Sequence, residues 1–217
     1  MTTTPIRTAT LPPLGLQGRQ NLLTLLSNLA AANALAWPLD AYRGSDENGI
    51  WHLGRAEFAG DGPVTFALAP DVLNATYGNR AAARIQRMEV TLVLGEYDPT
   101  LLEEDAVWFG ATLQIAGNSE MAAGARVRLV QPGVINLSQH RGSELRPVGQ
   151  RTVNAVVARL RLERDVDAGS VRVFFNDESL GEPVPMLPGE ALQPVLYVRG
   201  GGVIVSVTDW RITLHAG

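Results

Sequence analysis

After residue 50 the chain alternates between hydrophobic and polar side chains over many short stretches. The clearest stretch is residues 152–164, in which Ala158, Leu160 and Leu162 alternate with charged residues. Residues 125–131 show the same alternation. Successive side chains in a β-strand point to opposite faces of the sheet, so a period of two residues predicts strands with one buried face and one wet face.

The alternating stretches are separated by segments rich in Gly, Pro, Asn and Asp, which are typical turn residues. Strands are predicted at residues 51–58, 64–69, 84–97, 107–116, 125–131, 134–140, 152–164, 171–177, 195–200, 203–209 and 210–216. Residues 117–124 are predicted to form a loop, and Gly200 to Gly202 a hairpin turn. About ten short strands without a repeat of fixed period predict an all-β fold, a two-sheet antiparallel sandwich.

A different pattern precedes the strands. In residues 21–36 the leucines recur at helical spacing and share one face, which predicts a short amphipathic helix ending before Pro38. A signal peptide is the alternative, because the segment is apolar and ends in Ala-Leu-Ala. Residues 1–20, rich in Thr and Pro, are predicted to be an arm. The expected organisation is an arm and helix over residues 1–36, followed by one β-sandwich domain over residues 37–217.

The composition excludes several kinds of chemistry. The sequence has no cysteine and no lysine, and all 18 basic residues are arginine. Thiol nucleophiles, cysteine-bound metals, phosphate-binding lysines and Schiff bases are therefore excluded. The net charge is −4, and no basic stripe interleaved with aromatic residues points to nucleic acid. Residues 21–36 are too short and too polar to span a membrane, so no membrane span is expected.

Metal-binding and catalytic motifs are not found either. His52, His140 and His215 do not share the spacing of metal ligands, and no G-x-S-x-G sequence is present. The run from Gly200 to Gly202 lies between predicted strands and lacks the helix N-terminus that a phosphate site uses. We therefore expect no cofactor, no metal site and no catalytic residue set.

Two stretches in the last third of the sequence resemble a known family. Residues 159–185 combine an alternating strand, a turn from Asp165 to Gly169, a Val-Arg-Val-Phe strand and a short Asn-Asp turn. Residues 194–214 combine two strands around a glycine run and end in Trp-Arg-Ile-Thr-Leu. Together these stretches resemble the C-terminal part of concanavalin-A-like lectin and glucanase domains, including laminin-G-like modules. The resemblance implies a two-sheet antiparallel jelly-roll sandwich, here with a short N-terminal helix.

The family contains glycosidases as well as non-catalytic binders, which keeps a glycoside hydrolase among the alternatives. Its laminarinase-like enzymes place carboxylates at alternate positions of one strand, so that acid and nucleophile face the same side. The nearest match here is Glu163 and Asp165. It departs from the family pattern because Arg164 replaces an apolar residue, Asp167 replaces a glutamate and a turn follows. We therefore interpret these residues as a solvated hairpin tip and favour a binding module over an enzyme.

The resemblance implies a ligand face built from outward-facing side chains of strands and loops. Trp108 adjoins Phe109, so one of the two rings must face outward. The candidate ligand-binding residues, all expected to point outward, are Trp108, Gln114, Arg128, Gln139 and His140. The first hypothesis is thus a non-catalytic module that recognises a carbohydrate or a protein surface.

The second hypothesis is a structural subunit of a surface layer, a filament or a virion. Flexible arms such as residues 1–20 often bridge subunits, and jelly rolls recur in capsids. This hypothesis implies a homo-oligomer. An extracellular or cell-surface location is favoured, although nothing in the sequence fixes the compartment.

Overall fold

The computed structural model describes a chain built mainly from β-strands. The described residues are 43–45, 50–53, 56–58, 63–67, 70–77, 79–94, 107–131, 133–153, 157–199 and 205–214. The predicted arm and helix over residues 1–36 lie outside the described residues, as does the predicted domain boundary. The predicted all-β class is confirmed, because the described strands form two antiparallel sheets.

The first sheet, sheet A, contains the first and the last described strands. In hydrogen-bonded order it comprises β1 (Arg43–Ser45), β2 (Ile50–Leu53), β15 (Val205–Leu214), β5 (Ile85–Leu94), β10 (Val157–Asp165), β11 (Ser170–Phe175) and β12 (Glu178–Ser179). Two short strands join it at the side, β3 (Ala56–Phe58) on β15 and β13 (Val184–Pro185) on β11. The pairing of β15 with β2 places the last described strand beside one of the first described strands.

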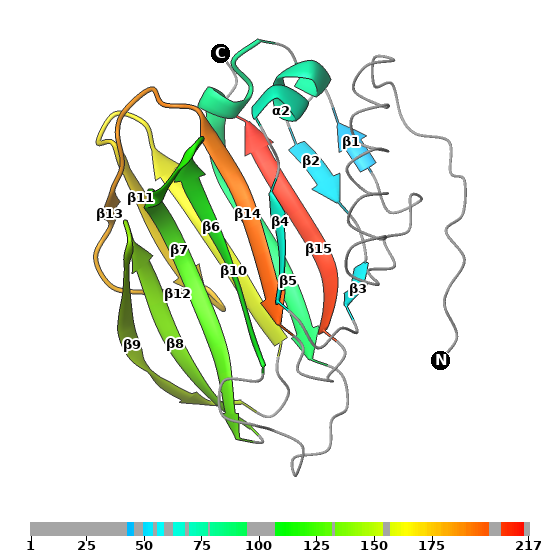
Figure 1. Ribbon diagram of the computed structural model, residues 1–217, viewed down its shortest axis with the longest axis vertical. Helices are drawn as coiled ribbons and strands as arrows, with labels where there is room; N and C mark the ends of the chain where they lie inside the picture. Colours follow the sequence, from blue (N-terminus) through cyan, green and yellow to red (C-terminus); the bar gives the residue numbers. More distant parts are fainter. Residues whose placement is uncertain are drawn as a thin grey trace.

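The second sheet, sheet B, carries the longest strand. Its order is β4 (Pro63–Ala67), β14 (Leu192–Arg199), β6 (Trp108–Ile115), β7 (Asn118–Gln131), β8 (Val134–Arg141) and β9 (Glu144–Thr152). The two sheets lie one over the other in the view of Figure 1. The chain therefore folds as the two-sheet jelly-roll sandwich that the sequence predicted.

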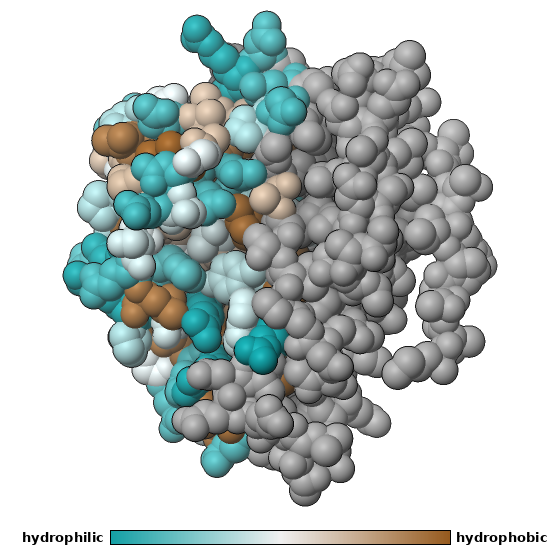
Figure 2. Space-filling view, in the orientation of Figure 1, coloured by the Kyte–Doolittle hydropathy of each residue, from teal (hydrophilic) through white to brown (hydrophobic). Residues whose placement is uncertain are grey.

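The hydrophobic core lies between the two sheets. Its largest fully buried side chains include Trp210 and Met88 from sheet A, and Phe109 and Leu113 from sheet B. Trp108 is only partly buried, so the prediction that one ring of the Trp108–Phe109 pair faces outward is confirmed. The outer surface in the view of Figure 2 is mainly hydrophilic over its described part, with small hydrophobic patches.

Two predicted connections differ from the structure. Residues 117–124, predicted as a loop, form the turn at Gly117 and the beginning of β7. The positive φ of Gly117, +75°, allows a tight reversal, so the small residues that follow remain in the sheet. The predicted hairpin between β14 and β15 is also wrong. These strands belong to sheet B and sheet A respectively, so the chain passes from one sheet to the other between Arg199 and Val205.

Two elements of eight or more residues were not predicted. The first is the edge strand β9, and the second is the helix α2 (Pro70–Tyr77), which a 3₁₀ turn, η2 (Ala82–Arg84), follows shortly afterwards. The side-chain amide of Asn74 in α2 accepts a hydrogen bond from the backbone of Ala82, which fastens the helix to the turn. Within the described residues, no helix has both the length and the apolar character needed to cross a membrane.

Candidate functional site

The side of sheet B that points away from the core carries the candidate site, and we call it the sheet-B face. Here the outward positions of five neighbouring strands come together. The residues of the sheet-B face used below are Trp108, Gly110, Gly124, Arg126, Arg128, Asn136, Ser138, His140, Leu145, Pro147, Gln150, Tyr197 and Arg199. Strands space their outward side chains about 6–7 Å apart along the chain, so the face is a grid of fixed positions.

The strand register brings distant parts of the sequence into rows across this face. In one row Arg199, Trp108 and Arg128 lie opposite one another on β14, β6 and β7. The same row continues through Asn136 to Gln150 on β8 and β9. In an antiparallel sheet, side chains at opposite positions are direct neighbours, so this row forms one continuous surface.

An aromatic cluster lies at the centre of the sheet-B face. The rings of Trp108 and Tyr197 have centroids 5.5 Å apart and are tilted by 58°. The Arg126 guanidinium lies over the Trp108 ring, 5.1 Å from its centroid, at a distance typical of a cation–π contact. The His140 ring meets Tyr197 edge to face at 5.7 Å. Four side chains from four strands thus hold one another in place.

A hydrogen-bond chain fixes Tyr197. Its hydroxyl lies 2.6 Å from Nε2 of His140 and donates to the carbonyl oxygen of Ala125 at 3.1 Å. Both contacts are satisfied when His140 carries its proton on Nε2 and donates to Tyr197. Burial, assisted by the charge of Arg126, lowers the pKa of His140 to about 4, and burial raises the pKa of Tyr197 above its usual value. Both rings are therefore neutral at pH 7.

Two mid-strand glycines make room for this arrangement. A methyl group on Gly110 would overlap the Tyr197 hydroxyl and the carbonyl oxygen of Ala125. A methyl group on Gly124 would overlap backbone atoms of the neighbouring strand β6. The missing side chain of Gly110 therefore leaves room for the Tyr197 ring, which contacts His140 on β8, whereas Gly124 permits the close approach of β6 and β7.

An open hollow of about 430 Å³ lies beside the aromatic cluster, over β7, β8 and β9. Its lining combines two arginines with amide, hydroxyl and apolar groups: Arg126, Arg128, Asn136, Leu137, Ser138, Leu145, Pro147, Gly149 and Gln150. The Gln150 amide donates to the side-chain oxygen of Asn136 at 3.2 Å, which orients both amides. None of the residues that line this hollow carries a carboxylate.

The neutral state of His140 makes the stability of the domain depend on pH. In the unfolded chain His140 has an ordinary pKa near 6.5, so at mildly acidic pH the unfolded state binds more protons than the folded state. Stability conferred by the neutral ring is complete at neutral pH and falls as the pH drops from about 7 towards 4. We expect a loss of about 2 kcal/mol between pH 7 and pH 5 from this residue.

Urea denaturation of the unmodified chain and of His140→Gln at pH 7, 6 and 5 measures this contribution. Glutamine does not titrate, so the free energy of unfolding of the variant should fall less over the same range. If the free energy of unfolding falls by the same amount with pH in both proteins, His140 is not the cause of the pH dependence.

Of the five predicted ligand residues, three lie together on the sheet-B face. Trp108 and Arg128 are direct neighbours, and His140 belongs to the aromatic cluster. Gln114 faces the same side but sits further along β6, about 20 Å from Trp108 by strand spacing, and does not line the hollow.

The expectation that Gln139 points outward is wrong. Its side chain is buried, with 3% of its surface exposed, and its amide nitrogen donates to the carbonyl oxygen of Glu182 at 3.0 Å. Arg141 donates to the same carbonyl at 2.7 Å and to Pro183 at 3.2 Å. Gln139 and His140 are consecutive residues of β8, and consecutive residues of a strand point to opposite faces of the sheet, so the two side chains cannot lie on the same face. Gln139 holds the segment before β13 instead.

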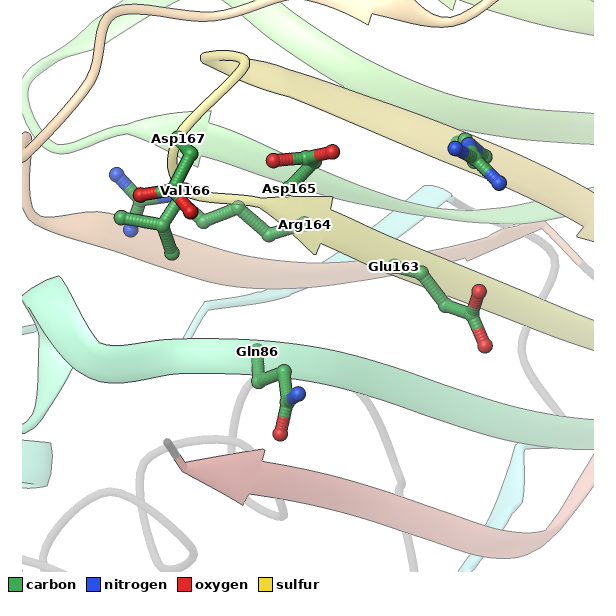
Figure 3. Close-up of a pocket in the computed structure, with 7 residues that line it drawn as sticks. Gln86, Glu163, Arg164, Asp165, Val166 and Asp167 are labelled. Atoms are coloured by element: carbon green, nitrogen blue, oxygen red, sulfur yellow. The ribbon is translucent and has the colours of Figure 1, made fainter. Parts of the chain in front are cut away.

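The carboxylates of Glu163 and Asp165 lie in a different hollow, on sheet A (Figure 3). It is formed by the end of β10, the turn that follows, Gln86 of β5 and Arg172 of β11. Glu163 is held by Arg87 at 2.9 Å and by Arg161 at 3.0 Å. Asp165 accepts a hydrogen bond from the backbone of Ala168 at 2.9 Å, which closes the turn. Both carboxylates thus have structural partners at the tip of a hairpin.

Sequence reasoning did not select Tyr197 or Gln150. Tyr197 lies in an apolar strand and Gln150 in a strand that was not predicted. The available signal was Gly110, a glycine inside the strand predicted at residues 107–116, because a glycine in a strand often marks close approach by another group. Within the described residues, no group of three or more histidines or carboxylates is arranged to hold a metal ion.

No family model matches the chain, and no curated protein matches it. Many solved structures share its architecture at low identity. A galectin from Caenorhabditis elegans is 14% identical with a TM-score of 0.40, covering 72% of this chain and 95% of its own. An alginate lyase from Pseudomonas aeruginosa is 12% identical with a TM-score of 0.48, covering 81% of this chain and 86% of its own.

A carbohydrate-binding module from Bacillus subtilis is 9% identical with a TM-score of 0.37, covering 77% of this chain and 89% of its own. The likeness in all three cases is one of overall architecture. A shared architecture does not by itself specify a function.

Proposed function

We propose that this chain is a non-catalytic recognition module that binds a carbohydrate in the hollow of the sheet-B face. One observation carries the proposal: a hollow lined by oriented amides, guanidinium groups and a hydroxyl lies beside a fixed aromatic cluster. Small-ligand sites combine apolar surface with a few well-placed polar groups in the same way.

The lining suits the chemistry of a sugar. A saccharide ring presents hydroxyl groups that both donate and accept hydrogen bonds, and Asn136, Gln150 and Ser138 do the same. Leu145 and Pro147 supply apolar surface for the C–H groups of the ring. All five residues are on paired strands, so they are in place before the ligand arrives and little entropy is lost on binding.

Recognition is favoured over hydrolysis by the nature of these groups. Glycoside hydrolysis generally uses two carboxyl groups flanking the bond, and the residues lining this hollow offer none. Glu163 and Asp165, the alternative pair, are on the other sheet and are engaged in ion pairs and a turn.

A hollow of about 430 Å³ also matches a short saccharide better than an extended protein surface, the other ligand considered. The assembly hypothesis rested on residues 1–20, which lie outside the described residues.

The exposed amide of Gln150 is the sharpest test of this site. Gln150→Ala removes one polar group from the hollow and should weaken binding of a glycan by about three- to tenfold, the value of one hydrogen bond. A glycan array with the full chain identifies the ligand, and calorimetric titration of both proteins with that glycan measures the change.

Gln86→Ala is the matched control, since Gln86 is an exposed glutamine in the hollow of sheet A. It should leave the affinity unchanged. An array without any signal would contradict carbohydrate binding, and equal losses in the two variants would place the ligand elsewhere.

A further inference from the structure

The two outer faces of the sandwich differ in charge. On sheet A, arginines alternate with carboxylates and pair with them, as Arg87 does with Glu163 and Arg211 with Glu89. On the sheet-B face, the defined residues include Arg126, Arg128 and Arg199 but no Asp or Glu. The charged side chains among these named residues are therefore all positive, although the chain as a whole has a net charge of −4.

We propose that the ligand of the sheet-B face is an acidic saccharide whose carboxylate or sulfate group binds to Arg126 at the wall of the hollow. This inference rests on the proposed function and specifies the class of glycan. Guanidinium groups donate two parallel hydrogen bonds to the paired oxygens of a carboxylate or a similar oxyanion, a charged acceptor that neutral sugars lack.

Arg161 in sheet A shows how an arginine stacked on a ring is used in this chain. Its guanidinium lies 4.1 Å from the centroid of Phe174 and also pairs with Glu163 at 3.0 Å and Asp177 at 3.8 Å. Stacking fixes the plane of the guanidinium and leaves its N–H edges available to an anion. The Arg161 guanidinium is thus in contact with a ring and with carboxylates at the same time.

Arg126 has the ring contact without the carboxylate. It stacks on Trp108 at 5.1 Å and lines the hollow, and no carboxylate of the described residues lies within ion-pair distance of it. Its positive field reaches the neighbouring ring, because it contributes to the lowered pKa of His140. An anionic group of a ligand in the hollow would be an ion-pair partner for Arg126, as Glu163 is for Arg161.

Two pairs of probes separate the charge of the ligand from its sugar. Oligogalacturonate and its fully methyl-esterified form differ only in the carboxylate, and dextran sulfate and dextran differ only in the sulfate. Calorimetric titration of the full chain with all four should show binding of at least one charged form about tenfold or more tighter than its neutral partner. Whichever pair shows the difference identifies the anionic group.

Arg126→Gln should lose at least about tenfold in affinity for that charged form. Arg172→Gln makes the same charge change on an exposed residue of sheet A, and its affinity should stay within about twofold of that of the unmodified chain.

Equal affinity of the unmodified chain for the charged and neutral forms would overturn the inference and leave carbohydrate binding intact. Equal losses in Arg126→Gln and Arg172→Gln would also overturn it. Binding of none of the four probes, together with an empty glycan array, would overturn the proposed function itself.

Discussion

Replacing Arg164 with alanine should lower the free energy of unfolding by about 4 kcal/mol. The Arg164 side chain points inward, and only 6% of its surface is exposed. Its two terminal nitrogens donate to the carbonyl oxygens of Ala83 at 2.9 Å and Glu190 at 3.1 Å. Alanine would remove both of these part-buried hydrogen bonds and would open a cavity, and each of these changes costs stability.

Two further variants separate the parts of this effect. Arg164→Met fills most of the volume without donating hydrogen bonds, so its loss should lie between zero and that of Arg164→Ala. Arg172→Ala changes an exposed arginine on the partner strand of the same hairpin and should cost no more than about 0.5 kcal/mol. Urea denaturation of the three variants gives the values. Similar midpoints for Arg164→Ala and Arg172→Ala would mean that the buried contacts contribute little.

Gly124→Ala should destabilise the domain by about 3 kcal/mol, because overpacking against backbone forces neighbouring strands to move. The added methyl group would overlap the carbonyl oxygen of Ala111 and the Cα of Thr112 on β6. A flexible side chain would rotate away from such a clash, but these atoms belong to a strand that is paired on both sides. The strain therefore spreads into the sheet.

Gly117→Ala tests whether the clash, and not the loss of glycine as such, is responsible. Gly117 has a φ of +75° and no atom within 4 Å of an added methyl group, so only conformational strain acts there. We expect a cost of about 1 kcal/mol for this variant in thermal and chemical denaturation. A larger loss at Gly117 than at Gly124 would contradict the steric explanation.

The hairpin formed by β10 and β11 was the part of the fold best predicted from sequence. Leu160 and Leu162 alternate with charged residues, and the structure buries the leucines while leaving Arg161 and Glu163 on the outer side. One face of this hairpin meets the core and the other meets water, so the pattern in the sequence has a single cause. Where that contrast holds, strand positions follow from the sequence.

The strand β9 lacks that contrast and was missed. None of its residues is buried, and it contains Pro147 and Gly149, which ordinarily argue against a strand. An edge strand needs hydrogen bonds on one side only, so proline is tolerated there. Its existence is decided by β8, which offers a free edge, and not by its own residues.

The site was harder to predict than the fold because it depends on strand order. His140 and Tyr197 are separated by 57 positions, and they meet only because β14, β6, β7 and β8 are neighbours in that order. The polarity of Gln139 suggested an outward residue, yet its side chain is buried and donates to the backbone carbonyl oxygen of Glu182. The adjacency of Trp108 and Phe109 predicted that only one of the two rings enters the core, and the structure buries Phe109 completely and Trp108 in part.

The position of β9 at the margin of sheet B has a consequence for how this domain can diversify. Leu145, Pro147 and Gln150 form one wall of the hollow, and no residue of their strand is part of the core. Substitutions in this wall alter the shape and polarity presented to a ligand while the packing between the sheets is preserved. Ligand preference can therefore change over evolutionary time, or in a directed library, at small expense to folding stability.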